Sequence, residues 1–184
     1  MRYRDTGEYE TISNLVSLVD FDENYPLESF DCGIEDYNNF LLHDAKKYIE
    51  LGISAVQLLI DNESNAVLGY IAMLTDSFYL DSEEKNQLEL DVPFNSVPAL
   101  KVGKLATHKD RNEFHYGCYL LELSLGYAQN LLEEGIACRF LTVDTDIEFR
   151  EDTPSYYEMY GFVRNLHKNQ KRKNVVSMRY DIFS

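Results

Sequence analysis

Apolar residues recur at helical spacing in two stretches of the chain, residues 35–50 and 118–132. Positions three or four apart share one face of a helix, so each stretch predicts a helix packed against a core. Gly52 and Gly135 follow the two stretches and are typical of helix ends. The apolar positions are Tyr37, Phe40, Leu41, Ala45, Tyr48 and Ile49 in the first stretch, and Leu121, Leu125, Ala128 and Leu132 in the second.

Shorter apolar runs predict strands. Residues 53–60 and 66–74 flank a polar turn at 61–65, which indicates a β-hairpin. Residues 81–96 are acidic, contain Pro93 and predict a surface excursion. The remaining predictions are strands at 12–19, 100–107, 138–143, 162–166 and 174–183, and a short helix at 153–160 that Gly161 ends. Helices and strands alternate in an order that favours one mixed α/β sheet with helices on its faces.

The chain of 184 residues shows no repeat and no linker, so we expect residues 1–184 to form a single domain. The amino terminus is polar, and no apolar run approaches the ~20 residues of a membrane span. Cys32, Cys118 and Cys138 lie far apart and outside any zinc-type spacing. We therefore expect a cytoplasmic protein with free thiols, no metal and no membrane partner.

The formal net charge of −15 disfavours nucleic acid as a partner, because nucleic-acid binding depends on Lys and Arg neutralising phosphates. An acidic surface instead attracts cationic acceptors. One basic cluster runs against this balance, and it consists of Arg164, Lys168, Lys171, Arg172 and Lys173.

Several segments resemble, in order, the GNAT N-acetyltransferases, in particular a bacterial branch with an "FDCG" segment near its amino terminus. The matching segments are Phe30-Asp31-Cys32-Gly33 with Tyr37-Asn38-Asn39-Phe40-Leu41, Val67-Leu68-Gly69-Tyr70, Lys101-Val102-Gly103-Lys104-Leu105-Ala106-Thr107, Phe140-Leu141-Thr142-Val143-Asp144 and Tyr156-Tyr157-Glu158-Met159-Tyr160-Gly161-Phe162. The resemblance implies the GNAT fold, a mostly antiparallel sheet of about six or seven strands with helices on both faces. It also implies a splay between the strands at 105–107 and 140–144, acetyl-CoA as co-substrate, and an amine of a small molecule or protein as acceptor. GNAT domains often pair, so a homodimer is a further expectation.

The family's CoA loop, Arg/Gln-x-x-Gly-x-Gly/Ala, aligns with Asn112-Glu113-Phe114-His115-Tyr116-Gly117, where His115 replaces the first glycine. The loop points backbone N–H groups at the pyrophosphate from a helix N-terminus, so other side chains are tolerated if their φ and ψ angles fit. His crowds a left-handed position, although it occurs at positive φ more often than most residues. Arg150 stands where the family commonly has Asn. By resemblance, the cofactor-binding residues are Leu105, Ala106, Thr107, Asn112, Glu113, Phe114, His115, Tyr116, Gly117, Cys118 and Arg150.

Tyr157 matches the family tyrosine near the sulfur and is the predicted general acid, since a tyrosine with a pKa of about 10 is protonated at neutral pH. No general base stands out. His108, Asp76 and Asp144 are candidates, but each fits better as an ordinary surface or strand-end residue. Cys118 fits packing better than nucleophilic catalysis.

Two other readings stay open. The substituted loop is compatible with a non-catalytic GNAT-like protein that binds a ligand or partner. The "FDCG" branch also resembles toxins that acetylate aminoacyl-tRNA, with the basic cluster at 164–173 as the feature in favour of an RNA substrate.

Overall fold

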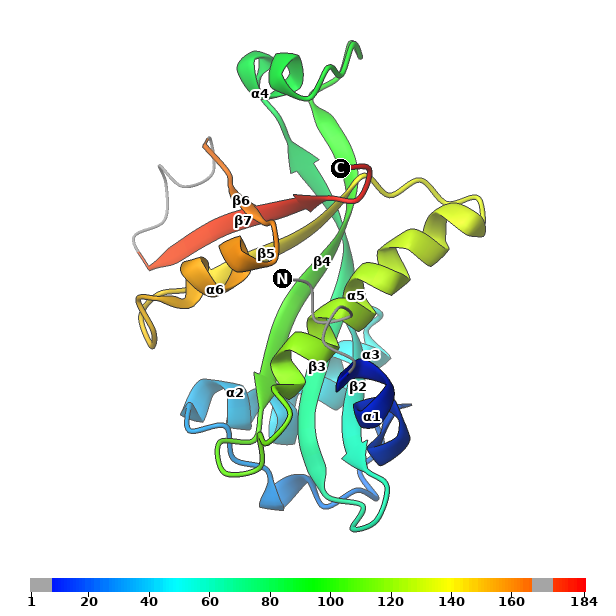
Figure 1. Cartoon of the computed structure of the whole chain (residues 1–184), viewed down its shortest axis with the longest axis vertical. Coiled ribbons are helices and arrows are strands. Elements are labelled where there is room, and N and C mark those ends of the chain that lie inside the picture. Colours follow the sequence, from blue (N-terminus) through cyan, green and yellow to red (C-terminus); the bar gives the residue numbers. More distant parts are fainter. Residues whose placement is uncertain (1–7, 167–173) are drawn as a thin grey trace. The chain divides into compact units, whose positions relative to one another are not determined.

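A computed structural model describes residues 8–166 and 174–184, and Figure 1 shows its elements. The helices are α1 (Glu8–Leu15), η2 (Leu27–Ser29), α2 (Glu35–Asn39), the π-helical η3 (Phe40–Asp44), α3 (Ala45–Glu50), α4 (Ser82–Gln87), α5 (Tyr116–Glu133) and α6 (Thr153–Met159). The strands are β1 (Val16–Asp20), β2 (Ala55–Asp61), β3 (Val67–Tyr79), β4 (Ser96–Thr107), β5 (Phe140–Asp146), β6 (Val163–Arg164) and β7 (Val175–Asp181). The seven strands are hydrogen-bonded in the order β1-β2-β3-β4-β5-β7-β6, which confirms the mixed α/β fold class.

The chain divides into two compact units, and each unit consists of two separate segments. The first unit contains residues 1–74 and 102–123, and the second contains residues 75–101 and 124–184. β3, β4 and α5 each begin in one unit and end in the other.

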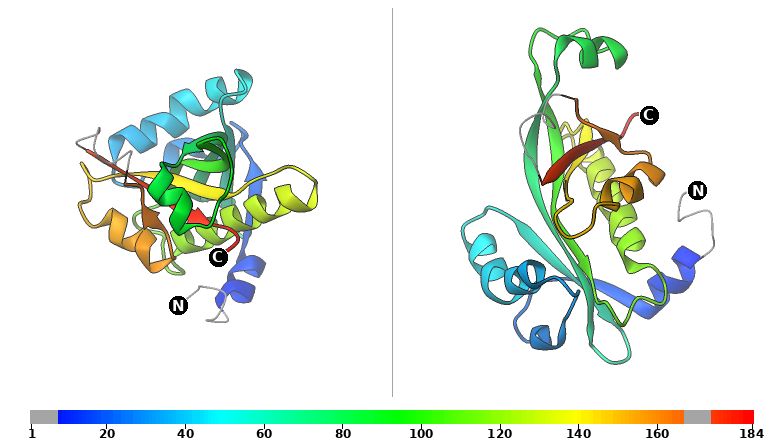
Figure 2. Two further views of the ribbon diagram at one scale, coloured as in Figure 1. Left: turned by 90° about the horizontal axis from the view of Figure 1, so that it is seen from above. Right: turned by 90° about the vertical axis from the view of Figure 1, so that its left-hand side faces the viewer.

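The core of the first unit lies between its strands and the helical segment from α2 to α3. β1 pairs with β2 and β2 with β3, both antiparallel. The Tyr70 ring on β3 is fully buried, stacks on Phe40 at 5.8 Å and donates its hydroxyl to the Tyr37 carbonyl at 2.9 Å. The next residue back, Gly69, faces Leu120 of α5. Because neighbouring strand residues point to opposite faces, helices cover both faces here, as Figure 2 shows.

In the second unit, β7 pairs antiparallel with both β5 and β6. Its core includes the rings of Phe78 and Phe140, 5.9 Å apart. An ion pair is also buried there, because Arg179 of β7 donates to Glu84 of α4 at 2.7 Å, and the two side chains are 7% and 0% exposed. α4 is thereby fixed to the carboxyl-terminal strand.

One prediction from the sequence is wrong, and one helix was not predicted. Residues 12–15 belong to α1, not to a strand, and only Val16 onward is extended. Ile12 is fully buried on that helix, and the Ser13 and Asn14 side chains both donate to the Glu10 carbonyl, which a helix brings within reach. The excursion at 81–96 contains α4, which begins with a capping box between Asp81 and Glu84. The other elements are confirmed within a few residues.

Candidate functional site

The end of β4 is held against β3 by a close backbone approach. The His108 N–H donates to the Leu68 carbonyl at 2.8 Å, which extends the pairing one residue beyond β4. A Cβ on Gly69 would lie 2.8 Å from the Ala106 carbonyl oxygen and 3.3 Å from Leu120 Cδ1. Gly69 is therefore required for this packing, and it fixes the strand from Leu105 to Thr107 that we predicted to face the pantetheine.

His115 adopts the left-handed backbone conformation, with φ of 53°. By the resemblance described above His115 aligns with a glycine, and a positive φ is the region that glycine enters most readily. The imidazole is exposed. The His115 carbonyl accepts the Cys118 N–H at 2.8 Å, which turns the chain into α5.

Asn112, the first residue of the aligned loop motif, bonds to the start of α5 through its side chain. Its side-chain oxygen accepts the Tyr116 N–H at 3.1 Å, and Tyr116 is the first residue of α5. Asn112 therefore satisfies one of the backbone donors that a helix N-terminus leaves without an intrahelical partner.

Charge in the loop is balanced, because Lys109 and Arg111 offset Asp110 and Glu113. An anion at this loop would therefore depend on backbone N–H groups and the dipole of the 18-residue helix α5. Gly117 and Cys118 lie in the first turn of that helix, and Phe114 packs near Tyr116 with ring centroids 6.2 Å apart. Burial raises the pKa of the Tyr116 hydroxyl, with a further contribution from the charge of Glu113.

Tyr157 and Arg150 belong to the second unit. Tyr157 lies on α6, is 6% exposed, and its ring packs edge-on against Phe162 at 5.4 Å. Its carbonyl accepts the N–H groups of Tyr160 and Phe162, at 3.0 and 3.2 Å. These two bonds form a tight turn at the end of α6. The Arg150 side chain is exposed, and its carbonyl accepts the Thr153 hydroxyl at 2.9 Å.

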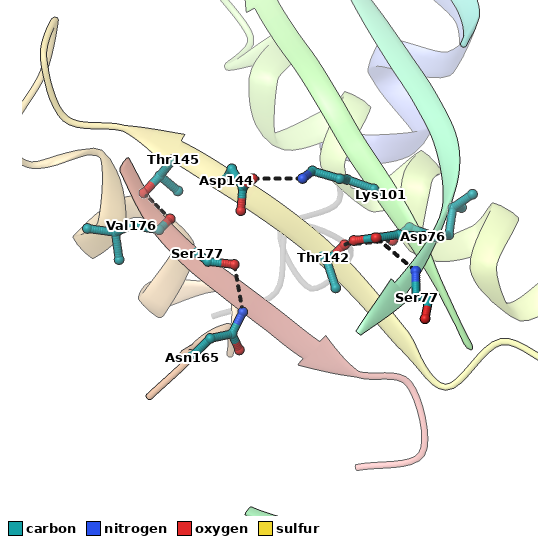
Figure 3. A network of polar contacts seen from close by, with 10 residues as sticks. Asp76, Ser77, Lys101, Thr142, Asp144, Thr145, Asn165, Val176 and Ser177 are labelled. Carbon is teal, nitrogen blue, oxygen red and sulfur yellow. Dashed lines mark hydrogen bonds and ion pairs between the residues drawn. The ribbon is translucent and has the colours of Figure 1, made fainter. Parts of the chain in front are cut away.

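The carboxylate candidates for a general base are engaged with partners in the second unit (Figure 3). Asp76 accepts the Thr142 hydroxyl at 3.0 Å, and Lys101 lies 2.7 Å from Asp144. In the first unit, His108 Nδ1 accepts the Asp110 N–H at 3.2 Å, which closes a turn. These contacts give all three residues structural roles.

Sequence reasoning missed the contacts around Asp31. Its carboxylate accepts the Gly33 N–H and the Asn38 amide and pairs with Lys109, and these bonds hold the pKa of that carboxyl far below its usual range. The FDCG resemblance singled out Asp31 but assigned it no role.

The remaining sequence predictions concern the basic cluster, a metal site and a membrane span. Lys168, Lys171, Arg172 and Lys173 of the basic cluster fall outside the described residues. Within residues 8–166 and 174–184, no group of three His, Cys, Asp or Glu side chains could hold a metal. The same residues include no helix long and apolar enough to cross a membrane.

The sequence matches no protein-family profile and no curated protein. Solved structures do match. A structure of AtaTR bound with AcCoA is 20% identical, has a TM-score of 0.73, and the match covers 92% of this chain and 95% of that one. A structure of AtaT complexed with acetyl-methionyl-tRNAfMet is 22% identical with a TM-score of 0.73, covering 90% and 94%. A tyrosine-to-phenylalanine mutant of KacT is 20% identical with a TM-score of 0.74, covering 92% and 96%. The chain therefore has the GNAT fold.

Proposed function

We propose that this protein is an N-acetyltransferase that transfers an acetyl group from acetyl-CoA to an amine. The observation that carries the proposal is the left-handed backbone of His115 directly before α5. A positive φ is the conformation that glycine adopts most readily, so His115 is compatible with the place of the glycine in a CoA loop. The likeness to the AtaTR structure bound with AcCoA supports the same ligand.

The proposed residue roles follow the chemistry. Acetyl-CoA supplies the acetyl group as a thioester. Backbone groups of Leu105, Ala106 and Thr107 would bind the pantetheine arm, one N–H would stabilise the developing oxyanion, and the loop from Asn112 to Cys118 would bind the pyrophosphate. The acceptor nitrogen bonds to the acetyl carbon as the carbon–sulfur bond breaks. Tyr157 gives its hydroxyl proton to the departing sulfur, and the amine loses a proton to solvent.

For the acceptor, we propose the amino group of an aminoacyl-tRNA as the first candidate to test, beside small-molecule and protein amines. The similar AtaT structure is complexed with acetyl-methionyl-tRNAfMet, which is at odds with a reading that sets nucleic acid aside. The net charge of −15 requires any RNA contact to be local. We further propose that residues 1–184 act as one cytoplasmic domain.

The first test is binding and turnover. We expect acetyl-CoA to raise the melting temperature, with about 2.7 kcal/mol of stabilisation at a hundredfold excess over its Kd. Release of CoA thiol should then be measured with aminoacyl-tRNA, uncharged tRNA, polyamines and peptides as acceptors. No thermal shift at millimolar acetyl-CoA would refute an acetyl-CoA-dependent function and would favour the non-catalytic reading.

The second test concerns Tyr157. We expect Tyr157→Phe to lower kcat by about a hundredfold, the lower range for loss of a general acid, and to change the Kd of acetyl-CoA little. Tyr160→Phe, three residues along the same turn, is the matched control and should keep its kcat. Equal turnover in both variants would remove Tyr157 from its role.

A further inference from the structure

The Asp31 carboxylate brings three donors from different parts of the first unit together. Oδ1 accepts the Gly33 N–H at 2.8 Å and the Asn38 Nδ2 at 2.9 Å, and Oδ2 lies 2.7 Å from Lys109 Nζ. The Lys109 N–H also donates to the Asp31 carbonyl at 2.9 Å. Asp31 and Lys109 are therefore joined twice, once through side chains and once through the backbone.

Lys109 occupies the start of the loop that leads from β4 to α5. It follows Thr107, the last residue of β4, by two positions and precedes Asn112 by three. The preceding residue, His108, packs its ring edge-on against Phe30 at 6.0 Å. The two residues that follow β4, His108 and Lys109, are thus both held by the segment that contains Phe30 and Asp31.

The Asp31–Lys109 pair is also connected to α2. Asn38 on α2 donates to Asp31, and its side-chain oxygen accepts the Cys32 N–H at 3.0 Å. Gly33, with φ of 82°, lies beneath the Lys109 side chain, because a Cβ there would be 3.7 Å from Lys109 Cδ. The next residues along that helical segment, Phe40 and Leu41, are buried in the core.

The position of this pair distinguishes it from an ordinary surface ion pair. The Lys109 and Asp31 side chains are 49% and 42% exposed, and exposed pairs contribute little to global stability. The pair instead fixes one end of a loop whose other end is fixed by the Asn112 cap on Tyr116. Losing the side-chain pair would loosen the loop beyond Lys109 while leaving the fold and the Lys109 N–H bond to the Asp31 carbonyl in place.

We propose that Asp31 is a positioning residue that acts through Lys109 to hold the β4–α5 loop in the conformation that binds the CoA pyrophosphate. This inference rests on the proposed function. It assigns the FDCG segment a role in cofactor affinity, because a loop that is already ordered loses less conformational entropy when the ligand binds.

The test compares Asp31→Asn, Lys109→Met, their combination and Lys109→Arg. Glu23→Gln is the matched control, because it breaks another exposed ion pair of the same unit, Glu23 with Lys46. We expect Asp31→Asn and Lys109→Met each to raise the Kd and KM of acetyl-CoA about 10-fold, as displacement of positioning groups does. kcat at saturation should stay within about twofold, since these groups touch no reacting atom. The double variant should lose no more than the larger single loss, because the two groups share one interaction. Lys109→Arg should keep most of the wild-type affinity for acetyl-CoA, because it retains a cation beside Asp31.

Backbone amide exchange of residues 108–117 gives a second readout that needs no ligand. Exchange there should be faster in Asp31→Asn than in Glu23→Gln, while the melting temperatures of the two variants should differ little, as expected for exposed ion pairs. An unchanged Kd together with unchanged exchange in Asp31→Asn would overturn the proposal. If the wild-type protein binds no acetyl-CoA, the proposed function fails, and exchange alone then decides whether Asp31 orders the loop.

Discussion

A torsion angle, and not a residue type, characterises the β4–α5 loop that we propose binds CoA. His115 was the obvious obstacle in the sequence, because its Cβ crowds the left-handed region. The structure places it there nonetheless, with φ of 53° and an exposed imidazole. The sequence predicted a loop directly before the long helix, and the structure has a loop there. The sequence could not fix the sign of φ, because that sign depends on the Asn112 bond to Tyr116 and on the turn into α5.

The left-handed angle predicts opposite effects for two substitutions at one position. His115→Gly should stabilise the protein by about 0.5–1 kcal/mol, since a non-glycine residue there carries roughly 1–3 kcal/mol of strain that the freer unfolded glycine offsets in part. His115→Val should destabilise it by about 1–2 kcal/mol, because β-branched residues are outliers at positive φ. Urea unfolding measures both. Acetyl-CoA affinity should change little in His115→Gly, and a large gain would mean that the wild-type loop is misplaced.

The Asp31–Lys109 pair predicts a stability contribution that is confined to a pH window. Hydrogen bonds from Lys109, Asn38 and Gly33 lower the pKa of Asp31, so its contribution is complete above the unfolded value of about 3.9 and declines as the pH falls toward the folded value. The bond to Asp31 raises the pKa of Lys109, so its share is complete below about 10.4 and declines as the pH rises through the folded value. Wild type and Asp31→Asn should therefore differ by a small amount in unfolding free energy at pH 7, and the difference should shrink as the pH falls below about 3.9. A gap that stayed constant with pH would contradict the assignment.

At the scale of elements, the long periodic segments were predictable, and two short helices, α1 and α4, were not. The helix expected at 118–132 is α5, Tyr116–Glu133, because its apolar stripe repeats over several turns. α1 and α4 are two turns or fewer and carry no such repeat. α4 did have a readable signal, the Asp81-x-x-Glu84 capping box, but it stands in an acidic run that also suits a loop.

Close packing of β3, β4 and α5 predicts that Gly69 cannot be replaced. Gly69→Ala should destabilise the protein by about 1–3 kcal/mol, because the added Cβ must displace the Ala106 carbonyl. It should also weaken acetyl-CoA binding, since Ala106 lies in the proposed pantetheine strand. Gly126→Ala is the matched control, because no atom lies within 4 Å of its Cβ position in α5. That variant should be stabilised by about 0.5–1 kcal/mol, as an alanine in a helix is. The same sign for both changes in urea unfolding would contradict the close approach.

The attachment of α4 predicts a large cost for a small change. Glu84→Gln keeps the capping box but leaves Arg179 buried without its carboxylate, so the unfolding free energy should fall by about 3 kcal/mol. Glu83→Gln, one residue earlier and exposed, should change it by less than about 0.5 kcal/mol. Urea unfolding of the two variants side by side measures the difference. Similar small effects would show that the ion pair is solvated.

At the scale of the whole molecule, the likeness to solved structures is much stronger in shape than in sequence. The AtaTR structure is 20% identical, yet the match covers 92% of this chain at a TM-score of 0.73. Buried positions accept many apolar residues of suitable size, and a loop accepts any residue that reaches the required φ, so a fold can persist while its motifs change. That is why the fold class followed from the sequence while the acceptor did not.

The excess of acidic side chains predicts that salt stabilises the protein. A net charge of −15 repels itself, and raising NaCl from about 0.01 to 0.15 M shortens the screening length from about 30 to 8 Å. Each kcal/mol of repulsion relieved should raise the melting temperature by about 2–4 °C in a chain of this size. KCl should act like NaCl in a thermal scan. A falling melting temperature would mean that surface ion pairs outweigh the repulsion.

The path of the chain through its two units has a practical consequence for dissecting the protein. The backbone passes from one unit to the other at 74/75, 101/102 and 123/124, in each case inside a strand or helix. No single stretch of the gene therefore encodes either unit, and a protease that nicks an exposed loop would leave two interlocked fragments instead of releasing one. Such a nick site, for instance within residues 61–65, is a natural place to divide the protein into two co-expressed halves, and the proposed acetyltransferase activity should return only when they reassemble.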